Sequence, residues 1–274
     1  MTSINLLNNL FRLGVLGFLL TGSVASGDII YEVSSTNTTL FTNNGNNLAN
    51  VSQSGDTSTG IFSLTHAGDV NQPFGIASNQ DLQTLNGGAI TSSDVVTLRY
   101  TLDDISVGDL QNIGLEFGLV DGPNFRNGGT EFYVNLRGNG QTSTVVNTFS
   151  STAVSPLNIA PLNEASLEDG VEVVITLDNA GYSVDINGAF EEGMPANTVF
   201  NQTGTFAPGE FVNAINDSHF YTTAQRGNAG NTSFVANFSE LSVHVATVAV
   251  PEPSSAVALW GGAFVLCIRR RRSR

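Results

Sequence analysis

Carboxylates that could act as a pair are the first residues to consider, because cleavage of a glycosidic bond needs two of them. A retaining reaction places the two carboxyl groups roughly 5 to 5.5 Å apart, which positions i and i+2 or i+4 of a strand can supply. EFGLVD holds Glu116 and Asp121, but they fall out of phase along an extended strand. LEDGVE holds Glu168, Asp169 and Glu172 around a turn. We expect both groups to be solvated edge and loop residues rather than a catalytic pair.

Other residue spacings that carry chemistry are absent from the sequence. His66, His219 and His244 are far apart and match no HExxH-like metal spacing, so each is expected at a surface or a strand end. A G-x-S-x-G nucleophile elbow is missing, and a phosphate-binding G-x-x-x-x-G-K-[ST] is impossible because the chain has no lysine. The only cysteine, Cys267, leaves no disulfide and no cysteine-based zinc site in the rest of the chain.

Calcium is the one metal that an acidic, Asn-rich chain makes plausible, because it takes six to eight oxygen ligands. VDGPNFRNGG, residues 120–129, places Asp121, Asn124 and Asn127 in one loop. The segment does not match EF-hand spacing, and one carboxylate is few. The alternative is a turn whose Asn and Gly residues serve the backbone conformation. No other cofactor is expected.

Aromatic side chains on a strand face would be needed to stack on a sugar. The only tryptophan, Trp260, lies in the C-terminal tail, so a carbohydrate site would depend on tyrosine and phenylalanine. Tyr133 and Tyr221 lie on or near the polar phase of their strands and are the carbohydrate candidates. The alternative for each is ordinary packing on a sheet.

Strands with a period of two must position these residues. The pattern is clearest in three segments, residues 94–102, 113–120 and 131–137, where every second residue is apolar. The apolar positions are Val96, Leu98, Tyr100, Leu102, Ile113, Leu115, Phe117, Leu119, Phe132, Val134 and Leu136. No segment of the middle keeps a 3.6-residue apolar period for three turns, so we expect little helix.

A hairpin is expected over residues 171–190, with its turn at 178–181 and a second tight turn at Asn187-Gly188. A last pair of strands follows at 219–225 and 232–245, and the apolar phase of the second slips before Leu241, which indicates a bulge or two short strands. Many short strands with Gly, Asn and Asp turns predict an all-β, two-sheet antiparallel sandwich.

We interpret residues 27–249 as one β-sandwich domain, because composition does not shift sharply within it. A break near 151–163 is the alternative, and a loop within the sandwich is the preferred reading of that segment. The hairpin and late strands, residues 171–245, resemble the second half of concanavalin A-like (laminin G-like) jelly rolls. The resemblance supports the fold. Glucanases among such jelly rolls use a Glu-x-Asp-x-x-Glu string or a close variant, and no such string occurs here.

The N-terminal residues 1–26 are typical of a cleavable secretory signal helix, with a charge at Arg12 and an apolar stretch of eight residues from Leu13 to Leu20. Cleavage is expected after Ala25, with Ser26 or Gly27 as alternatives. A short core helix is the competing interpretation of this segment.

The C-terminal residues 250–274 combine a proline triplet, a short hydrophobic helix and an arginine cluster. The apolar run of 15 residues from Ser254 to Ile268 would be about 22 Å long as a helix, short for a permanent span but enough for transient membrane insertion. The arginines would stay on the cytoplasmic side. The residues of the triplet and the cluster are Val250, Pro251, Glu252, Pro253, Arg269, Arg270, Arg271 and Arg272.

This order of features resembles the PEP-CTERM sorting signal that bacterial exosortases recognise. The resemblance implies an exosortase partner, processing near the triplet, and release or transfer to the cell surface in a Gram-negative-type bacterium that makes exopolysaccharide. Trp260 and Cys267 are less usual than leucine in such a tail. A retained membrane anchor is the alternative.

Charge excludes one class of partner. Residues 27–250 hold 23 of the 24 acidic residues against four arginines, and so negative a surface repels nucleic-acid phosphates. The sequence therefore favours an exported, non-enzymatic structural or adhesive component of a bacterial envelope or exopolysaccharide matrix. The alternatives are a lectin-like carbohydrate-binding module and, third, a glycan-active enzyme.

Overall fold

The computed structural model describes residues 27–42, 48–67, 73–107, 113–122, 131–137, 144–149, 153–157, 170–188, 198–226 and 234–247. The expected signal helix with its cleavage site at Ala25, and the sorting segment 250–274 with its helix, lie outside these residues. Asn124 and Asn127 of the proposed calcium loop also lie outside them.

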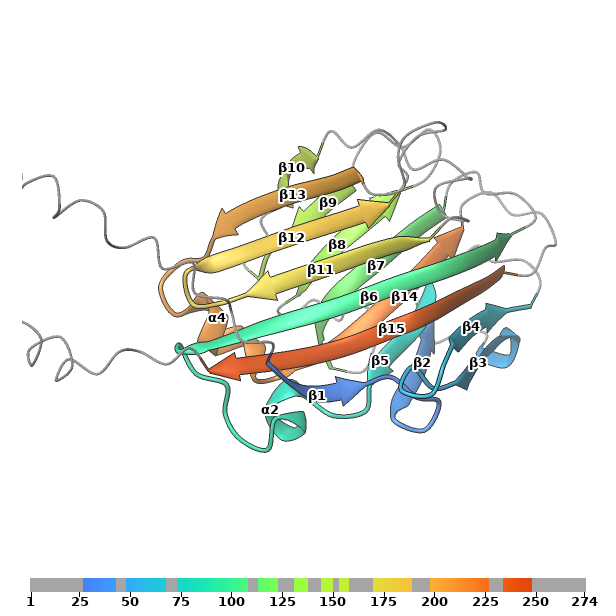
Figure 1. Cartoon of the computed structure of the whole chain (residues 1–274), viewed down its shortest axis with the longest axis horizontal. Coiled ribbons are helices and arrows are strands. Elements are labelled where there is room, and N and C mark those ends of the chain that lie inside the picture. The colour runs from blue at the N-terminus through green and yellow to red at the C-terminus, as the bar shows by residue number, and fades with distance from the viewer. Residues whose placement is uncertain are drawn as a thin grey trace, which may run out of the picture.

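Two antiparallel sheets packed face to face form the body, as the alternation predicts (Figure 1). The sheet nearer the viewer, here the front sheet, has the order β13 (Thr198–Thr205), β12 (Gly181–Gly188), β11 (Val171–Leu177), β6 (Asp94–Val107), β15 (Phe234–Thr247), β4 (Phe62–His66) and β3 (Val51–Gly55), with β1 (Asp28–Glu32) also paired to β15. The back sheet has the order β10 (Ala153–Leu157), β9 (Thr144–Asn147), β8 (Phe132–Arg137), β7 (Ile113–Asp121), β14 (Ser218–Arg226), β5 (Phe74–Ser78) and β2 (Thr38–Thr42).

The core lies between the sheets, because each central strand turns alternate apolar residues toward the other layer. One cluster of buried residues extends along the chain from Tyr31 to Val243. Tyr100 of β6 links the layers, since its ring stacks on Phe220 at a centroid distance of 4.8 Å and its hydroxyl donates to the Gly118 carbonyl at 3.0 Å. The apolar positions predicted on residues 96–102 and on Phe132, Val134 and Leu136 are all buried in this core.

The expected hairpin is confirmed as β11 and β12, with Leu177 opposite Tyr182 and Val173 opposite Ile186. The second turn expected at Asn187-Gly188 is wrong. Both residues continue β12 and remain paired with β13, and Gly188 does not have positive φ. Pairing with strands on both sides holds this Asn-Gly step extended.

The two late strands are present, but they are not partners of each other. β14 lies in the back sheet between β7 and β5, whereas β15 lies in the front sheet. The bulge expected before Leu241 is confirmed, because the register of β15 against β6 shifts between Asn237 and Phe238 and again between Phe238 and Glu240.

Several short elements were not predicted from the apolar periodicity of the sequence. β10 crosses the segment expected to be a loop near 151–163, and Pro156 is tolerated there because β10 is an edge strand. α2 (Leu82–Leu85) begins at the N-cap Asp81, α4 (Glu210–Ile215) precedes β14, and the 3-10 turn η2 (Leu48–Asn50) precedes β3. Within the described segments, no helix has the length and apolar character needed to cross a membrane.

Candidate functional site

The outer face of the back sheet carries the clearest group of polar side chains. Register across three strands sets Glu116 of β7 directly between Asn135 of β8 and Thr223 of β14. The next row sets Gly118 between Tyr133 and Tyr221. Because side chains alternate along a strand, both rows point away from the core between the sheets.

Glu116 is buried, with only 6% of its surface exposed. Its Oε1 accepts a hydrogen bond from Asn135 Nδ2 at 2.7 Å, and its Oε2 accepts a longer one from the Tyr221 hydroxyl at 3.4 Å. The expectation of a solvated edge residue is therefore wrong. β7 is the central strand of the sheet, so side chains of the strands on both sides, Asn135 and Tyr221, reach the carboxylate.

Asn135 is 7% exposed and uses its two polar atoms unequally. Nδ2 donates to Glu116, whereas Oδ1 is buried and has no hydrogen-bond partner among the described residues. An unpaired buried acceptor costs about 1 to 3 kcal/mol, so a group that donates a hydrogen bond to this oxygen would be stabilised by it.

Tyr133 and Tyr221, expected from sequence to be carbohydrate candidates, come together on this face. Tyr221 is buried in a small apolar cluster with Phe41, Ala77 and Val120, and Tyr133 is half-buried against that cluster. A side chain at Gly118 would collide with the backbone of β8, so glycine is needed between the tyrosines. Sequence reasoning missed Glu116 and Asn135 as their neighbours, since the contact depends on strand register.

Glu131 is the second carboxylate that alternation places on this face. It precedes β8 and stands four residues from Asn135, the residue opposite Glu116. Four residues of extended strand correspond to a rise of about 13 Å along the backbone, and the two side chains can shorten or lengthen the separation of the carboxyl groups themselves. The register of β7 and β8 therefore does not place Glu131 directly opposite Glu116.

Asp121 ends β7 and is exposed, out of phase with Glu116 as the sequence indicates. No group of three or more His, Cys, Asp or Glu residues is gathered within the described part of the chain. The calcium loop therefore stays a prediction.

The histidines lie on three different strands. His66 is buried at the end of β4 beside the Phe74 ring, at a centroid distance of 5.0 Å. His219 Nδ1 lies 2.8 Å from the Ser78 carbonyl oxygen. His244 Nε2, on the outer face of the front sheet, lies 3.0 Å from Ser242 Oγ and 3.8 Å from Glu240 Oε1. His66 ends β4 and His219 is the second residue of β14, whereas His244 is partly exposed on an outer face, so each lies at a strand end or a surface as expected.

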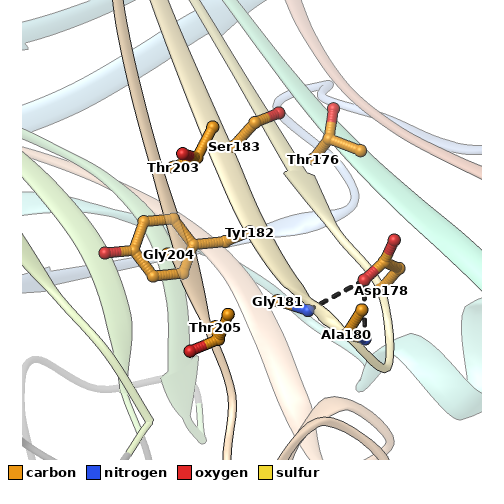
Figure 2. A pocket seen from close by; sticks show the side chains of 9 residues that line it. All are labelled: Thr176, Asp178, Ala180, Gly181, Tyr182, Ser183, Thr203, Gly204 and Thr205. Carbon is orange, nitrogen blue, oxygen red and sulfur yellow. Dashed lines mark hydrogen bonds between the residues drawn. The ribbon is translucent and has the colours of Figure 1, made fainter.

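A second feature is a hollow of about 600 Å³ in the outer face of the front sheet, beside the β11–β12 turn (Figure 2). Thr176, Ser183, Thr203 and Thr205 line its sides. Glycine is needed at position 181, because a side chain there would collide with the Gly204 carbonyl of β13. Sequence reasoning assigned no role to this turn beyond closing the hairpin.

Asp178 and Tyr182 fix the two sides of that turn. Asp178 Oδ1 accepts from the backbone N–H of Ala180 at 2.7 Å and of Gly181 at 2.9 Å. Tyr182 anchors β12 in the core, with its ring 5.2 Å from that of Phe132. Burial raises the pKa of Tyr182, and the nearby Gln202 side chain offsets part of that rise. The buried hydroxyl has no hydrogen bond of ordinary geometry.

The comparisons with known proteins show a similarity of fold only. No protein-family model and no curated protein matches the sequence. Among solved structures, the chain is similar to a seed lectin of Lotus tetragonolobus, at 8% identity over 82% of this chain and 100% of that one, with a TM-score of 0.47.

Arcelin-5, a lectin-like defense protein from Phaseolus vulgaris, is similar at 12% identity over 80% of this chain and 97% of its own, with a TM-score of 0.46. The exoplasmic/lumenal domain of VIP36, in a form bound to Ca²⁺ and Man3GlcNAc, is similar at 10% identity over 85% and 93%, with a TM-score of 0.44. The neighbours have lectin-type concanavalin A-like jelly-roll folds, the fold class that the sequence indicated. At these values they assign neither a site nor a ligand to this chain.

Proposed function

We propose that the sandwich is a non-catalytic carbohydrate-binding module that acts through the outer face of its back sheet. The observation that carries the proposal is the buried pair Glu116 and Asn135, set beside Tyr133 and Tyr221. A carboxylate, an amide oxygen and the partly exposed ring of Tyr133 together match the mixed polar and apolar surface of a sugar.

Each group has a role in such a site. Sugar hydroxyls donate hydrogen bonds, and the Asn135 Oδ1 atom and the Glu116 carboxylate would accept them once ligand binding uncovers these buried groups. Tyr133 is half-buried, so part of its surface remains for contact with a ligand.

Charge supports neutral glycans as the ligand class. The whole chain has a formal net charge of −14, and Glu116 adds a buried carboxylate at the site itself. Uronate or sulfate groups would be repelled both by the net charge of the whole chain and by the Glu116 carboxylate.

Affinity electrophoresis of the full chain through gels containing dextran, xyloglucan, galactomannan or alginate tests the proposal. We expect retardation by at least one neutral polysaccharide, none by alginate, and at least a tenfold loss of affinity in Glu116→Gln. Glu172→Gln, on the outer face of the front sheet, is the matched control and should bind like the wild type. Migration unaffected by every neutral polysaccharide would refute the proposal.

We also propose that the protein is exported, inserted transiently in the inner membrane and sorted by an exosortase-type enzyme into the envelope or exopolysaccharide matrix. The support is the order of features in residues 1–26 and 250–274. In this setting the module would serve as a structural or adhesive matrix component. The intact mass of the protein from its native host should lack the arginine cluster, and a chain that still ends at Arg274 would contradict sorting.

A further inference from the structure

We infer that the hollow beside the β11–β12 turn is a second glycan-contacting site, so that one domain holds two sugar chains on opposite faces. The inference takes its ligand class from the proposed function. Only residues of the front sheet and its β11–β12 turn line this second site. None of them lies on the outer face of the back sheet, which holds Glu116.

Unused hydroxyl groups surround the hollow. Thr176, Ser183, Thr203 and Thr205 line it, and none of their side-chain oxygens hydrogen-bonds to another residue of the described segments. Figure 2 shows these side chains on the three strands β11, β12 and β13 that border the hollow. A hydroxyl both donates and accepts, so the group complements a ligand that is itself rich in hydroxyls.

Strand pairing holds these hydroxyls in a row. Thr176 is opposite Ser183, which is opposite Thr203, on three adjacent strands. Thr97 of β6 extends the same row beyond Thr176. Neighbouring strands are about 4.8 Å apart, so the four residues form a track of about 14 Å. A track of this length suits a chain of sugar units better than a single one.

The turn keeps the end of the track in place. Asp178 Oδ1 accepts both hydrogen bonds from the backbone of the turn, which holds the carboxylate at the rim of the hollow. Tyr182 holds the same strand from the core side. The site is therefore preorganised on paired strands.

The lining also defines which ligands are excluded. It contains no positive charge and one carboxylate, so it disfavours anions. A single carboxylate with one oxygen already engaged is a poor set of ligands for calcium, which takes six to eight oxygens. The volume of about 600 Å³ lies within the range of roughly 300 to 1,000 Å³ for small-molecule sites. Neutral, hydroxyl-rich chains fit these limits.

The two faces point away from each other, because they are the outer faces of the two packed sheets (Figure 1). A domain that contacts one chain through Glu116 and another through the hollow would cross-link neutral polysaccharide without forming a dimer. This would give a matrix protein a mechanical role.

Isothermal titration calorimetry of the full chain with cellohexaose, xylohexaose and mannohexaose tests the inference. We expect two sites per chain for at least one hexasaccharide. The double variant Thr176→Val/Thr203→Val keeps the side-chain shape, removes two hydroxyls and should leave one site. Thr101→Val, a matched change on the same outer face away from the hollow, should leave two. Glu116→Gln should also leave one site, the one in the hollow.

The other possible results distinguish the hollow from the Glu116 site. One site that Glu116→Gln abolishes and the double variant leaves intact would overturn this inference and keep the proposed function. One site that only the double variant abolishes would keep the hollow and overturn the Glu116 site. No binding of any hexasaccharide would overturn both. Light scattering from galactomannan solutions should rise on adding the wild type and not on adding the double variant.

Discussion

Asn135 lies directly opposite Glu116 on the neighbouring strand. Its side-chain amide donates a hydrogen bond of 2.7 Å to the Glu116 carboxylate. The pair lies on the outer face of a sheet and is nevertheless buried. A similar pair, Asn201 and Asp185, joins β13 to β12 over 2.6 Å on the front sheet, where it is exposed. The two pairs differ in burial, and burial decides how strongly a charge change is felt.

Asn135→Asp should lower the free energy of unfolding at pH 7 by about 3 kcal/mol or more, because it buries a second carboxylate against the first. The pair would then bind a proton with a raised pKa in the folded state. Stability should therefore return as the pH falls toward 5. Urea unfolding at pH 5 and 7 measures the effect.

Asn201→Asp is the control for that change. Its partner Asp185 is at the surface, where solvent and salt screen repulsion, so we expect a loss below about 1 kcal/mol. An equal loss in both variants would mean that burial of the Glu116 face has no energetic consequence.

Tyr182→Phe should leave stability unchanged or raise it by up to about 1 kcal/mol, because the hydroxyl that it removes is buried and makes no hydrogen bond of ordinary geometry to a described residue, although the Gln202 side chain lies nearby. Tyr100→Phe removes a hydroxyl that donates to the Gly118 carbonyl and should cost about 1 kcal/mol. Thermal unfolding of the two variants compares them directly. A larger loss in Tyr182→Phe than in Tyr100→Phe would contradict the assignment.

Alkaline pH should destabilise the fold. Burial raises the pKa of Tyr31, Tyr100 and Tyr182 above the usual tyrosine value. The unfolded chain loses these protons near pH 10 and the folded chain retains them, so stability is complete below pH 10 and falls above it.

The slope of that decline gives a quantitative check. Each retained proton contributes about 1.4 kcal/mol per pH unit, so Tyr100→Phe should flatten the decline between pH 10 and 11 by about that amount. Denaturant unfolding across this range measures it, and stability that stays constant up to pH 11 in the wild type would be inconsistent with three buried tyrosines.

Asp94→Asn should destabilise the start of β6 by about 1 to 3 kcal/mol at pH 7. Asp94 Oδ2 accepts from the Thr91 backbone at 2.7 Å, and Oδ1 accepts from the Thr247 hydroxyl at 2.6 Å. Burial acts to raise the pKa of Asp94, but the hydrogen bonds outweigh it and the pKa is lowered.

The direction in which stability changes with pH follows from the lowered pKa of Asp94. Stability from Asp94 is present above about pH 4 and is lost as the pH falls through the lower folded-state pKa. The difference between wild type and Asp94→Asn should therefore shrink at pH 2 to 3. Asp56→Asn, in an exposed turn, is the control and should change the unfolding midpoint less. If the difference in stability between the wild type and Asp94→Asn is the same at pH 7 and at pH 2, the carboxylate charge is not involved.

Sequence-based reasoning succeeded where the signal is local. Alternation placed Tyr100 and Val134 in the core, and the turn before Gly181 joined the two strands of the hairpin. It failed at Asn187-Gly188, where pairing on both sides overrides the preference of the dipeptide for a turn. It also failed at Glu116, whose phase was clear but whose burial was not.

The sequence by itself determined which residues share a strand face, because side chains alternate with a period of two wherever the backbone is extended. It also marked Tyr133 and Tyr221 as lying on the polar phase. Only the tertiary structure decided that these tyrosines share one surface with Glu116 and Asn135, and that β14 and β15 belong to opposite sheets. Strand pairing joins residues as far apart in sequence as Glu116 and Tyr221, and the register of such non-local contacts is set by packing of the whole sandwich.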